Sequence, residues 1–321
     1  MRNEYTNYDE ILININQLID FLDTFEVFAK FRSHLENDYL IAQEFVKKVN
    51  IKEPNNVSDV EGRSALGGLH ELYKMIWSVK DCEDFHKIIP HLNLLKESAT
   101  RINAVVPMIS PVTGKQDDSS NKLIETIIAM FAIAFGSDVD LDDPVKSSNG
   151  LNPDILLTYK GKRIAIACKT LRGSSEQTIL SNIQSAAKQI ERAECDYGYI
   201  VINTMNILPH DLINNNIYDN IQVPAKIITA ELHNKIKQLK STANDEISEL
   251  FNNSPKTSPV ISYFVHSTTK MPNPFSEPNS APSYVATMLK SIVVDEIITT
   301  PNFNNDIEFL DLLNNFIHHK L

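Results

Sequence analysis

The sequence predicts an α/β protein in which a mixed β-sheet is flanked by helices and preceded by an all-helical region. Three observations support this fold class. Apolar residues between positions 1 and about 105 recur at helical spacing. Two β-type runs, 154–159 and 163–170, stand on either side of a Lys-Gly pair. An amphipathic segment then separates the second run from an apolar strand at 197–203, which predicts a right-handed parallel crossover.

The helical region is followed by a change of composition. Ile11, Ile15, Leu18 and Leu22 lie on one helical stripe, and a second stripe runs from 69 to 79. A stretch at 107–120, rich in Pro, Ser, Gly and Asp, is typical of a domain boundary. We therefore expect a helical domain over 1–110, used for partner docking or oligomerisation. A second domain over 115–321 would contain the sheet and a C-terminal extension.

The second part predicts elements in the order α-β-β-β-α-β. Ser119 or Ser120 would cap a helix that ends near 135, and a short strand follows at 139–141. The two β-type runs come next. Ser174–Gln177 has the form of a capping box and would open a helix before the strand at 197–203. Farther on, we expect a helix at 225–240, a strand at 260–266, and helices near 284–294 and 306–318.

Charge is distributed unevenly along the chain. The net charge is −11, which argues against indiscriminate binding to nucleic acid because phosphate contacts require Lys and Arg. Residues 155–192, however, contain seven basic and two acidic side chains, a local charge of +5. This basic island is compatible with a nucleic-acid site confined to one face, although an ordinary solvated surface would give the same composition.

Several classes of protein are disfavoured. The first ten residues are polar, unlike a signal peptide, and the longest apolar run, 127–135, is too short to cross a bilayer. The three cysteines have no zinc-type spacing, which favours reduced thiols in a cytoplasmic protein outside the membrane. No GxxxxGK[ST] sequence is present, so any helicase or ATPase activity would belong to a separate protein partner.

The Lys-Gly pair fixes a register. If Lys160 and Gly161 form a two-residue hairpin loop, the numbers of directly paired residues sum to 321. Asp154 then faces Ala167, and Lys169 lies two residues farther along on the same face. Alternate residues of the second run, such as Ile166, point to the opposite side and are expected in the core. The hairpin therefore gathers an acid, position 167 and a lysine at its open end.

This arrangement suits phosphodiester hydrolysis, provided that position 167 carries an acid. Two carboxylates can hold a divalent cation that polarises the phosphate and lowers the pKa of a bound water. A lysine can orient that water or offset charge in the transition state. Mg²⁺ prefers such sites, in which a few carboxylates are supplemented by water and substrate oxygens.

The motif resembles that of the PD-(D/E)xK nucleases. Pro153-Asp154, twelve intervening residues and then Ala167-Cys168-Lys169 are similar to the family pattern, within the matching element order over about 119–203. Glu125, in the preceding helix, resembles an additional acid found in many members. The resemblance implies a restriction-endonuclease-like core. It also implies that Glu125, Asp154 and an acid at 167 hold Mg²⁺ or Mn²⁺, with Lys169 catalytic.

The departure from the family pattern is Ala167, whose methyl group cannot bind a metal. Three explanations are open. The alanine is a laboratory substitution; or the acid has migrated, with Glu176 or, less plausibly, Glu191 in its place; or the chain is a non-catalytic homologue. Retention of Glu125, Asp154 and Lys169 argues against long decay of the site.

The resulting functional hypothesis is an endonuclease that cleaves DNA with a divalent metal, in restriction or antiviral defence, and that is inactive or nearly so with Ala167. The competing hypothesis is a nuclease-like module that binds nucleic acid or docks a helicase-type partner without turnover. In a third, the helical region makes the protein mainly an assembly subunit. Candidate nucleic-acid contacts are Lys160, Lys162, Arg163, Arg172, Gln184 and Lys188.

Overall fold

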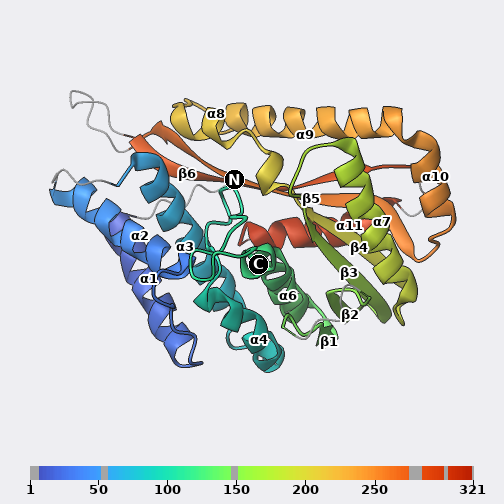
Figure 1. The fold of residues 1–321 in the computed structure, drawn as a ribbon, viewed down its shortest axis with the longest axis horizontal. Helices are drawn as coiled ribbons and strands as arrows, with labels where there is room; N and C mark the ends of the chain where they lie inside the picture. Colours follow the sequence, from blue (N-terminus) through green and yellow to red (C-terminus); the bar gives the residue numbers. More distant parts are fainter. Residues whose placement is uncertain (1–6, 52–56, 146–150, 275–283, 300–302, 320–321) are drawn as a thin grey trace.

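A computed structural model describes residues 7–51, 57–145, 151–274, 284–299 and 303–319. It is an α/β protein built on a six-stranded mixed sheet whose strand order follows the chain (Figure 1). The strands are β1 (Ser137–Leu141), β2 (Ile155–Tyr159), β3 (Lys162–Thr170), β4 (Tyr197–Asn203), β5 (Thr257–Pro272) and β6 (Tyr284–Glu296). Neighbouring strands are antiparallel, except that β3, β4 and β5 run parallel to one another.

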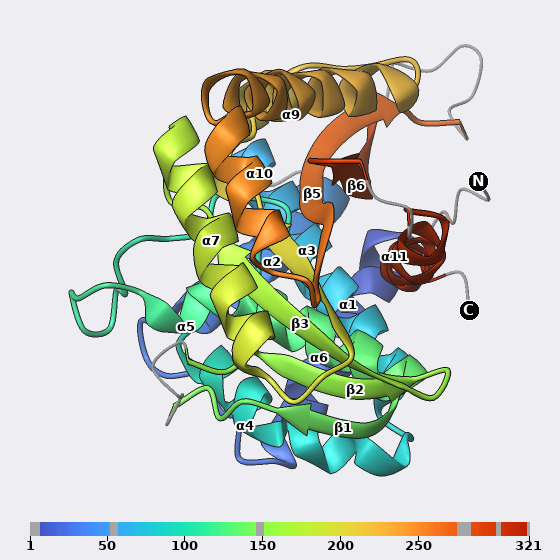
Figure 2. The same cartoon turned by 90° about the vertical axis from the view of Figure 1, so that its right-hand side faces the viewer.

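Helices cover both faces of the sheet. Before the sheet lie α1 (Tyr8–Asp23), α2 (His34–Ile51), α3 (Asp59–Val79), α4 (Ile89–Leu92), α5 (Asp118–Asn121) and α6 (Leu123–Phe135), with short 3-10 turns at Glu83–Ile88 and Asn93–Lys96. Within and after it lie α7 (Glu176–Arg192), α8 (His210–Asn215), α9 (Gln222–Thr242), α10 (Asn244–Asn252) and α11 (Phe303–Ile317). Helices α3, α6 and α11 pack on one face, whereas α7, α9 and α10 lie on the other (Figures 1 and 2). None of the described helices is both long and apolar enough to span a membrane.

The hairpin of β2 and β3 has the register that its turn predicts. Tyr159 pairs with Lys162, and the two loop residues between them both have positive φ, 49° at Lys160 and 75° at Gly161. Positive φ at both positions is the conformation of a type I′ turn, whose twist matches that of the flanking strands. The pairing continues without a bulge to Ile155 and Ile166.

The crossover from β3 to β4 is parallel, as expected. Its helix, α7, begins one residue later than the predicted capping box, because Ser175 rather than Ser174 accepts the N–H of Thr178, at 3.2 Å. The C-terminal half of α7 packs tightly on the sheet at Gly198. A Cβ added there would lie 2.5 Å from Ile190 of the helix, so glycine is required for this approach.

The helix predicted from 119 to 135 is divided into α5 and α6. Asp117, and not Ser119 or Ser120, caps α5 by accepting the N–H of Ser120 at 2.8 Å. The helical path is interrupted at Lys122, whose backbone φ and ψ are −86° and 0°. This interruption places Lys122 at the first turn of α6, beside Glu125.

The segment predicted as a helix near 284–294 is instead strand β6. It pairs with β5 over its whole length, from Tyr284 opposite Pro272 to Glu296 opposite Val260. Long-range pairing of β-branched residues there overrides the apparent helical spacing. The outer edge of β6 is partly covered, because the N–H of Ile292 donates to Asn314 Oδ1 of α11 at 2.9 Å. The helix expected near 306–318 corresponds to α11.

The N-terminal helices pack directly against the sheet. Buried residues of α1–α3 and of the sheet belong to one continuous apolar cluster. A buried ion pair joins Glu71 of α3 to Lys290 of β6 at 2.8 Å, and His319, after α11, lies 2.9 Å from the same carboxylate oxygen. The division into a domain over 1–110 and another over 115–321 stays a prediction.

Candidate active site

The first residue of the site, Asp154, directly precedes β2. Because Ile155 pairs with Ile166, the next residues outward, Asp154 and Ala167, face each other across the hairpin. The Asp154 carboxylate accepts the backbone N–H of Cys168 at 2.6 Å, which fixes its side chain against β3. Both residues are buried, and Ala167 is fully so. The acid and the alanine of the motif are therefore neighbours at the open end of the hairpin.

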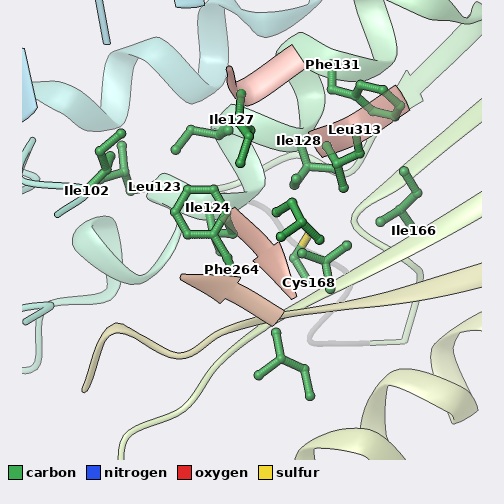
Figure 3. Close-up of a cluster of buried hydrophobic side chains, with 14 of the residues drawn as sticks. Ile102, Leu123, Ile124, Ile127, Ile128, Phe131, Ile166, Cys168, Phe264 and Leu313 are labelled. Atoms are coloured by element: carbon green, nitrogen blue, oxygen red, sulfur yellow. The ribbon is translucent and has the colours of Figure 1, made fainter. Parts of the chain in front are cut away.

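Alternation along β3 separates core residues from site residues. Ile166 and Cys168 are buried and belong to the apolar cluster that also contains Ile124 and Ile128 of α6 (Figure 3). Lys169 points the other way, toward α7, as the hairpin parity predicts. The thiol of Cys168 belongs to the packed core, and burial raises its pKa, with the Asp154 and Glu125 carboxylates adding to the effect.

Lys169 is held by a residue that the sequence reasoning did not select. Its ammonium donates to Gln189 Oε1 of α7, and Gln189 Nε2 in turn donates to the carbonyl of Asn152 at 2.8 Å. Gln189 is only 2% exposed. It thus connects α7, the lysine and the segment that leads into Asp154. The candidates Gln184 and Lys188 are half-buried and exposed, respectively, and it is Gln189 on the same helix that binds Lys169.

Glu125 reaches the site from the opposite layer. It lies in the first turn of α6, where its carboxylate pairs with Lys122 Nζ at 2.6 Å and its side chain is 12% exposed. Asp154 raises the pKa of Glu125 and Lys169 lowers it, so Glu125 lies within electrostatic reach of both hairpin residues. The structure therefore gathers Glu125, Asp154, position 167 and Lys169 around one end of the hairpin.

The two carboxylates are expensive to ionise together. Burial raises the pKa of Glu125 to about 7, with repulsion from Asp154 adding to the effect and Lys122 and Lys169 opposing it. Burial also raises the pKa of Asp154, against the opposing effects of Lys169 and the Cys168 N–H. Desolvation and like charge favour the protonated forms of such a pair, and a bound cation would favour the ionised forms.

The residues present fit a divalent cation only in part. Glu125 and Asp154 offer the hard oxygen ligands that Mg²⁺ and Mn²⁺ prefer. Ala167 offers none, and within the described residues no three His, Cys, Asp or Glu side chains are grouped to hold a metal. Two of the three ligands implied by the family resemblance are therefore at hand.

The two proposed substitute acids differ in their surroundings. Glu191 Oε1 accepts the N–H of Lys256 and the hydroxyl of Thr257, both at 2.9 Å, and so binds the start of β5. Moving it to the site would break both hydrogen bonds. Glu176 is half-buried in the first turn of α7. Its role as a migrated acid stays a prediction.

The basic island is split between the two ends of the hairpin. Lys160, Lys162 and Arg163 lie at or beside the turn, where Lys160 pairs with Glu308 and Arg163 donates to the Asp138 carbonyl. At about 3.3 Å per residue, Arg163 is roughly 20 Å along β3 from Lys169. Arg172 follows the opposite end of β3. These residues therefore do not form one basic face around the candidate site.

The chain matches no family model, no curated protein and no solved structure. The function is therefore inferred from the residues of the site.

Proposed function

We propose that this chain, with an acid at position 167, is a metal-dependent nuclease of the PD-(D/E)xK type that hydrolyses DNA, most simply as an endonuclease. With Ala167 it would be inactive or nearly so. The observation that carries the proposal is the hairpin register, which puts Asp154 opposite position 167, one step beyond the Ile155–Ile166 pair. Lys169 lies two residues farther along that face, and Glu125 approaches from α6.

Each residue would have a distinct role. Glu125, Asp154 and the acid at 167 would hold Mg²⁺ or Mn²⁺, and the cation when bound would supply Lewis-acid activation of the phosphate. Lys169 would orient the attacking water or offset charge on the phosphate oxygens. Lys122 would hold the Glu125 carboxylate in place through its ion pair.

The biological setting follows only by analogy. Restriction or antiviral defence is the setting that the family resemblance suggests, and fold resemblance does not by itself determine function. A helicase-type or ATPase partner, or a second copy of the chain, would dock on the helical region over 1–110. These assignments belong to the proposal and do not affect its test.

A cleavage assay on plasmid and oligonucleotide substrates with Mg²⁺ and Mn²⁺ tests the proposal. Ala167→Glu should gain metal-dependent cleavage that the parent chain lacks, and Ala167→Gln, with similar shape and no charge, should not. Lys169→Ala in the Ala167→Glu background should abolish the activity. Lys237→Ala is the matched control, because it removes an exposed lysine from α9 rather than from the hairpin.

The results also separate the alternatives. Strong cleavage by the Ala167 chain, lost in Glu176→Gln, would assign the metal ligand to Glu176. Binding of DNA without cleavage by folded Ala167→Glu, with both metals, would favour the non-catalytic module. One observation is compatible with this non-catalytic module. Lys169 donates to Gln189 and Lys122 pairs with Glu125, so both lysines have partners without a metal.

A further inference from the structure

Lys122 is the second lysine of the candidate active site, and its backbone is fixed on both sides. Its N–H donates to the carbonyl of Ser119 at 3.1 Å, and its own carbonyl accepts the N–H of Thr126 at 3.0 Å and the hydroxyl of Thr126 at 3.1 Å. The preceding carbonyl, that of Asn121, accepts the hydroxyl of Thr170 at the end of β3 at 3.1 Å. The break between α5 and α6 is therefore tied to the sheet, and a movement of Lys122 would involve its side chain rather than its backbone.

The Lys122 ammonium interacts with both acids of the site. Its Nζ lies 2.6 Å from Glu125 Oε2. Burial lowers the pKa of Lys122, but Glu125 and Asp154 outweigh burial and raise this pKa above its usual value, so the ammonium is within electrostatic reach of both carboxylates. A divalent cation held by Glu125 and Asp154 would depend on the same two charges. Lys122 therefore neutralises charge that such a cation needs.

A hollow of about 450 Å³ adjoins the Lys122 side chain. Besides Lys122, its wall carries two acids, Glu97 and Asp118, and two lysines, Lys30 and Lys96, so the charges of the wall balance. The Lys122 side chain is 23% exposed and lies between the buried acids of the site and this hollow. An ammonium that leaves the site would therefore enter a space that is roomy and has no surplus of positive charge.

Lys122 also lies between two acids along the chain. Glu125 follows it by three residues and Asp118 precedes it by four, and side chains at both spacings are neighbours on a helix. The structure pairs Lys122 with Glu125, while Asp118 lines the same hollow as Lys122. The Asp118 side chain is 75% exposed, accepts from Gln116 at 2.6 Å and lies 3.7 Å from Arg172, and such surface contacts are weak. Asp118 is therefore an alternative partner for the Lys122 ammonium.

We propose that Lys122 is a built-in counter-ion that competes with the divalent cation for Glu125, and that its ammonium moves into the hollow beside Asp118 when a cation binds. This inference deepens the proposed function, on which it rests for the identity of the site, because it describes how metal binding there is regulated. While no cation is bound, Lys122 holds the Glu125 carboxylate in place. The same contact raises the concentration of metal that the site requires.

Mn²⁺ binding to the full chain, measured at pH 8 from the electron paramagnetic resonance signal of the free ion and without nucleic acid, tests the competition. In the Ala167→Glu background, Lys122→Gln keeps a hydrogen-bond donor for Glu125 but removes the charge. It should tighten Mn²⁺ binding by about tenfold or more, the lower end of the coupling between close pairs of charges. Lys122→Arg keeps the charge and should leave the affinity within about twofold of that of Ala167→Glu alone. Lys122→Met replaces Lys122→Gln if the latter does not fold.

A second variant tests the movement of the ammonium. Asp118→Asn removes the acid that the displaced Lys122 would approach, so in the Ala167→Glu background it should weaken Mn²⁺ binding by about twofold to fivefold, the range of an exposed ion pair. With Lys122→Gln also present, the same change should have no measurable effect, whereas a mere loss of negative charge near the cation would weaken binding in both backgrounds. Lys47→Gln is the matched control, because it breaks an exposed pair with Glu44 at a three-residue spacing on α2, and it should change the affinity by less than about twofold.

The two proposals can fail separately. Mn²⁺ binding that is unchanged or weaker in Lys122→Gln, or unaffected by Asp118→Asn, would overturn the counter-ion proposal, while cleavage of DNA by Ala167→Glu would keep the nuclease. Tighter Mn²⁺ binding in Lys122→Gln, without cleavage by Ala167→Glu, would keep the counter-ion and overturn the nuclease. If none of the variants binds Mn²⁺, both proposals fall.

Discussion

Restoring the acid at position 167 should make the stability of the protein depend on divalent metal. Ala167 is fully buried, so Ala167→Glu introduces a carboxylate at a position shielded from bulk solvent. The nearest cations are already engaged, Lys122 with Glu125 and Lys169 with Gln189. A buried charge without a partner costs several kcal/mol, and forcing a longer side chain into a packed position costs about 1–3 kcal/mol.

The magnitude of the metal effect follows from linkage. A ligand that binds only the native state at a hundred times its Kd stabilises it by about 2.7 kcal/mol. An unfolding entropy of about 2.1 cal/mol/K per residue gives about 0.67 kcal/mol/K for the 321 residues. Mg²⁺ or Mn²⁺ at that concentration should therefore raise the melting temperature of Ala167→Glu by about 4 °C.

Thermal melts with and without metal test this expectation. The parent and Ala167→Gln should respond by less than about 1 °C, because each lacks the third charged ligand. If Ala167→Glu does not fold without metal, Ala167→Asp offers a shorter side chain for the same measurement. A folded acidic variant whose melting temperature ignores saturating Mg²⁺ and Mn²⁺ would refute the assignment of position 167 as a metal ligand.

Three further predictions concern neighbouring groups. In the Ala167→Glu background, Asp154→Asn should still accept the Cys168 N–H and keep the fold, yet lose the metal-induced rise in melting temperature and at least about a hundredfold in cleavage rate. The pKa of Glu125 is higher in the folded protein than in the unfolded chain, so the free energy of unfolding should fall as pH rises from about 4.5 to about 7. Urea titrations at pH 5 and pH 8 should show a smaller fall in this free energy for Glu125→Gln than for the parent chain. Asp306→Ala should destabilise the protein by about 2–3 kcal/mol in urea, because the Asp306 carboxylate accepts from Tyr197, Tyr199 and Ser258. The exposed Asp311, on the same helix, should change stability by less than about 0.5 kcal/mol when replaced by Ala.

The hairpin could be predicted from sequence because its determinants are local. A Lys-Gly pair that accepts positive φ sets the turn, and the turn sets every pair up to Ile155 and Ile166. The parity of a strand then assigns Ala167 and Lys169 to one face. The parallel crossover to β4 was predictable for a similar reason, because an amphipathic helix lies between two apolar runs.

The features that were missed depend on distant partners. The segment 284–296 has helical spacing in places, but its conformation is decided by thirteen pairs with β5. The role of Gln189 arises only when α7 meets both Lys169 and the carbonyl of Asn152. The sequence carried no clear signal for it, because Gln189 is next to Ile190 and so lies about 100° around the helix from it, on the flank of the stripe of Ile179, Ile183 and Ile190.

The charge balance of the site explains why an inactive form would still fold. Two acids, Glu125 and Asp154, lie among two lysines, Lys122 and Lys169. With alanine at 167 and both acids ionised, the local charge is zero, and protonation of Glu125, whose pKa is raised to about 7, leaves no excess of negative charge either, so a metal is not required for stability. An added carboxylate would bring it to −1, and desolvation would then favour either protonation or a divalent cation. Position 167 therefore decides whether the same four neighbours make a neutral, self-paired cluster or a cation site, and that choice can be measured independently of cleavage.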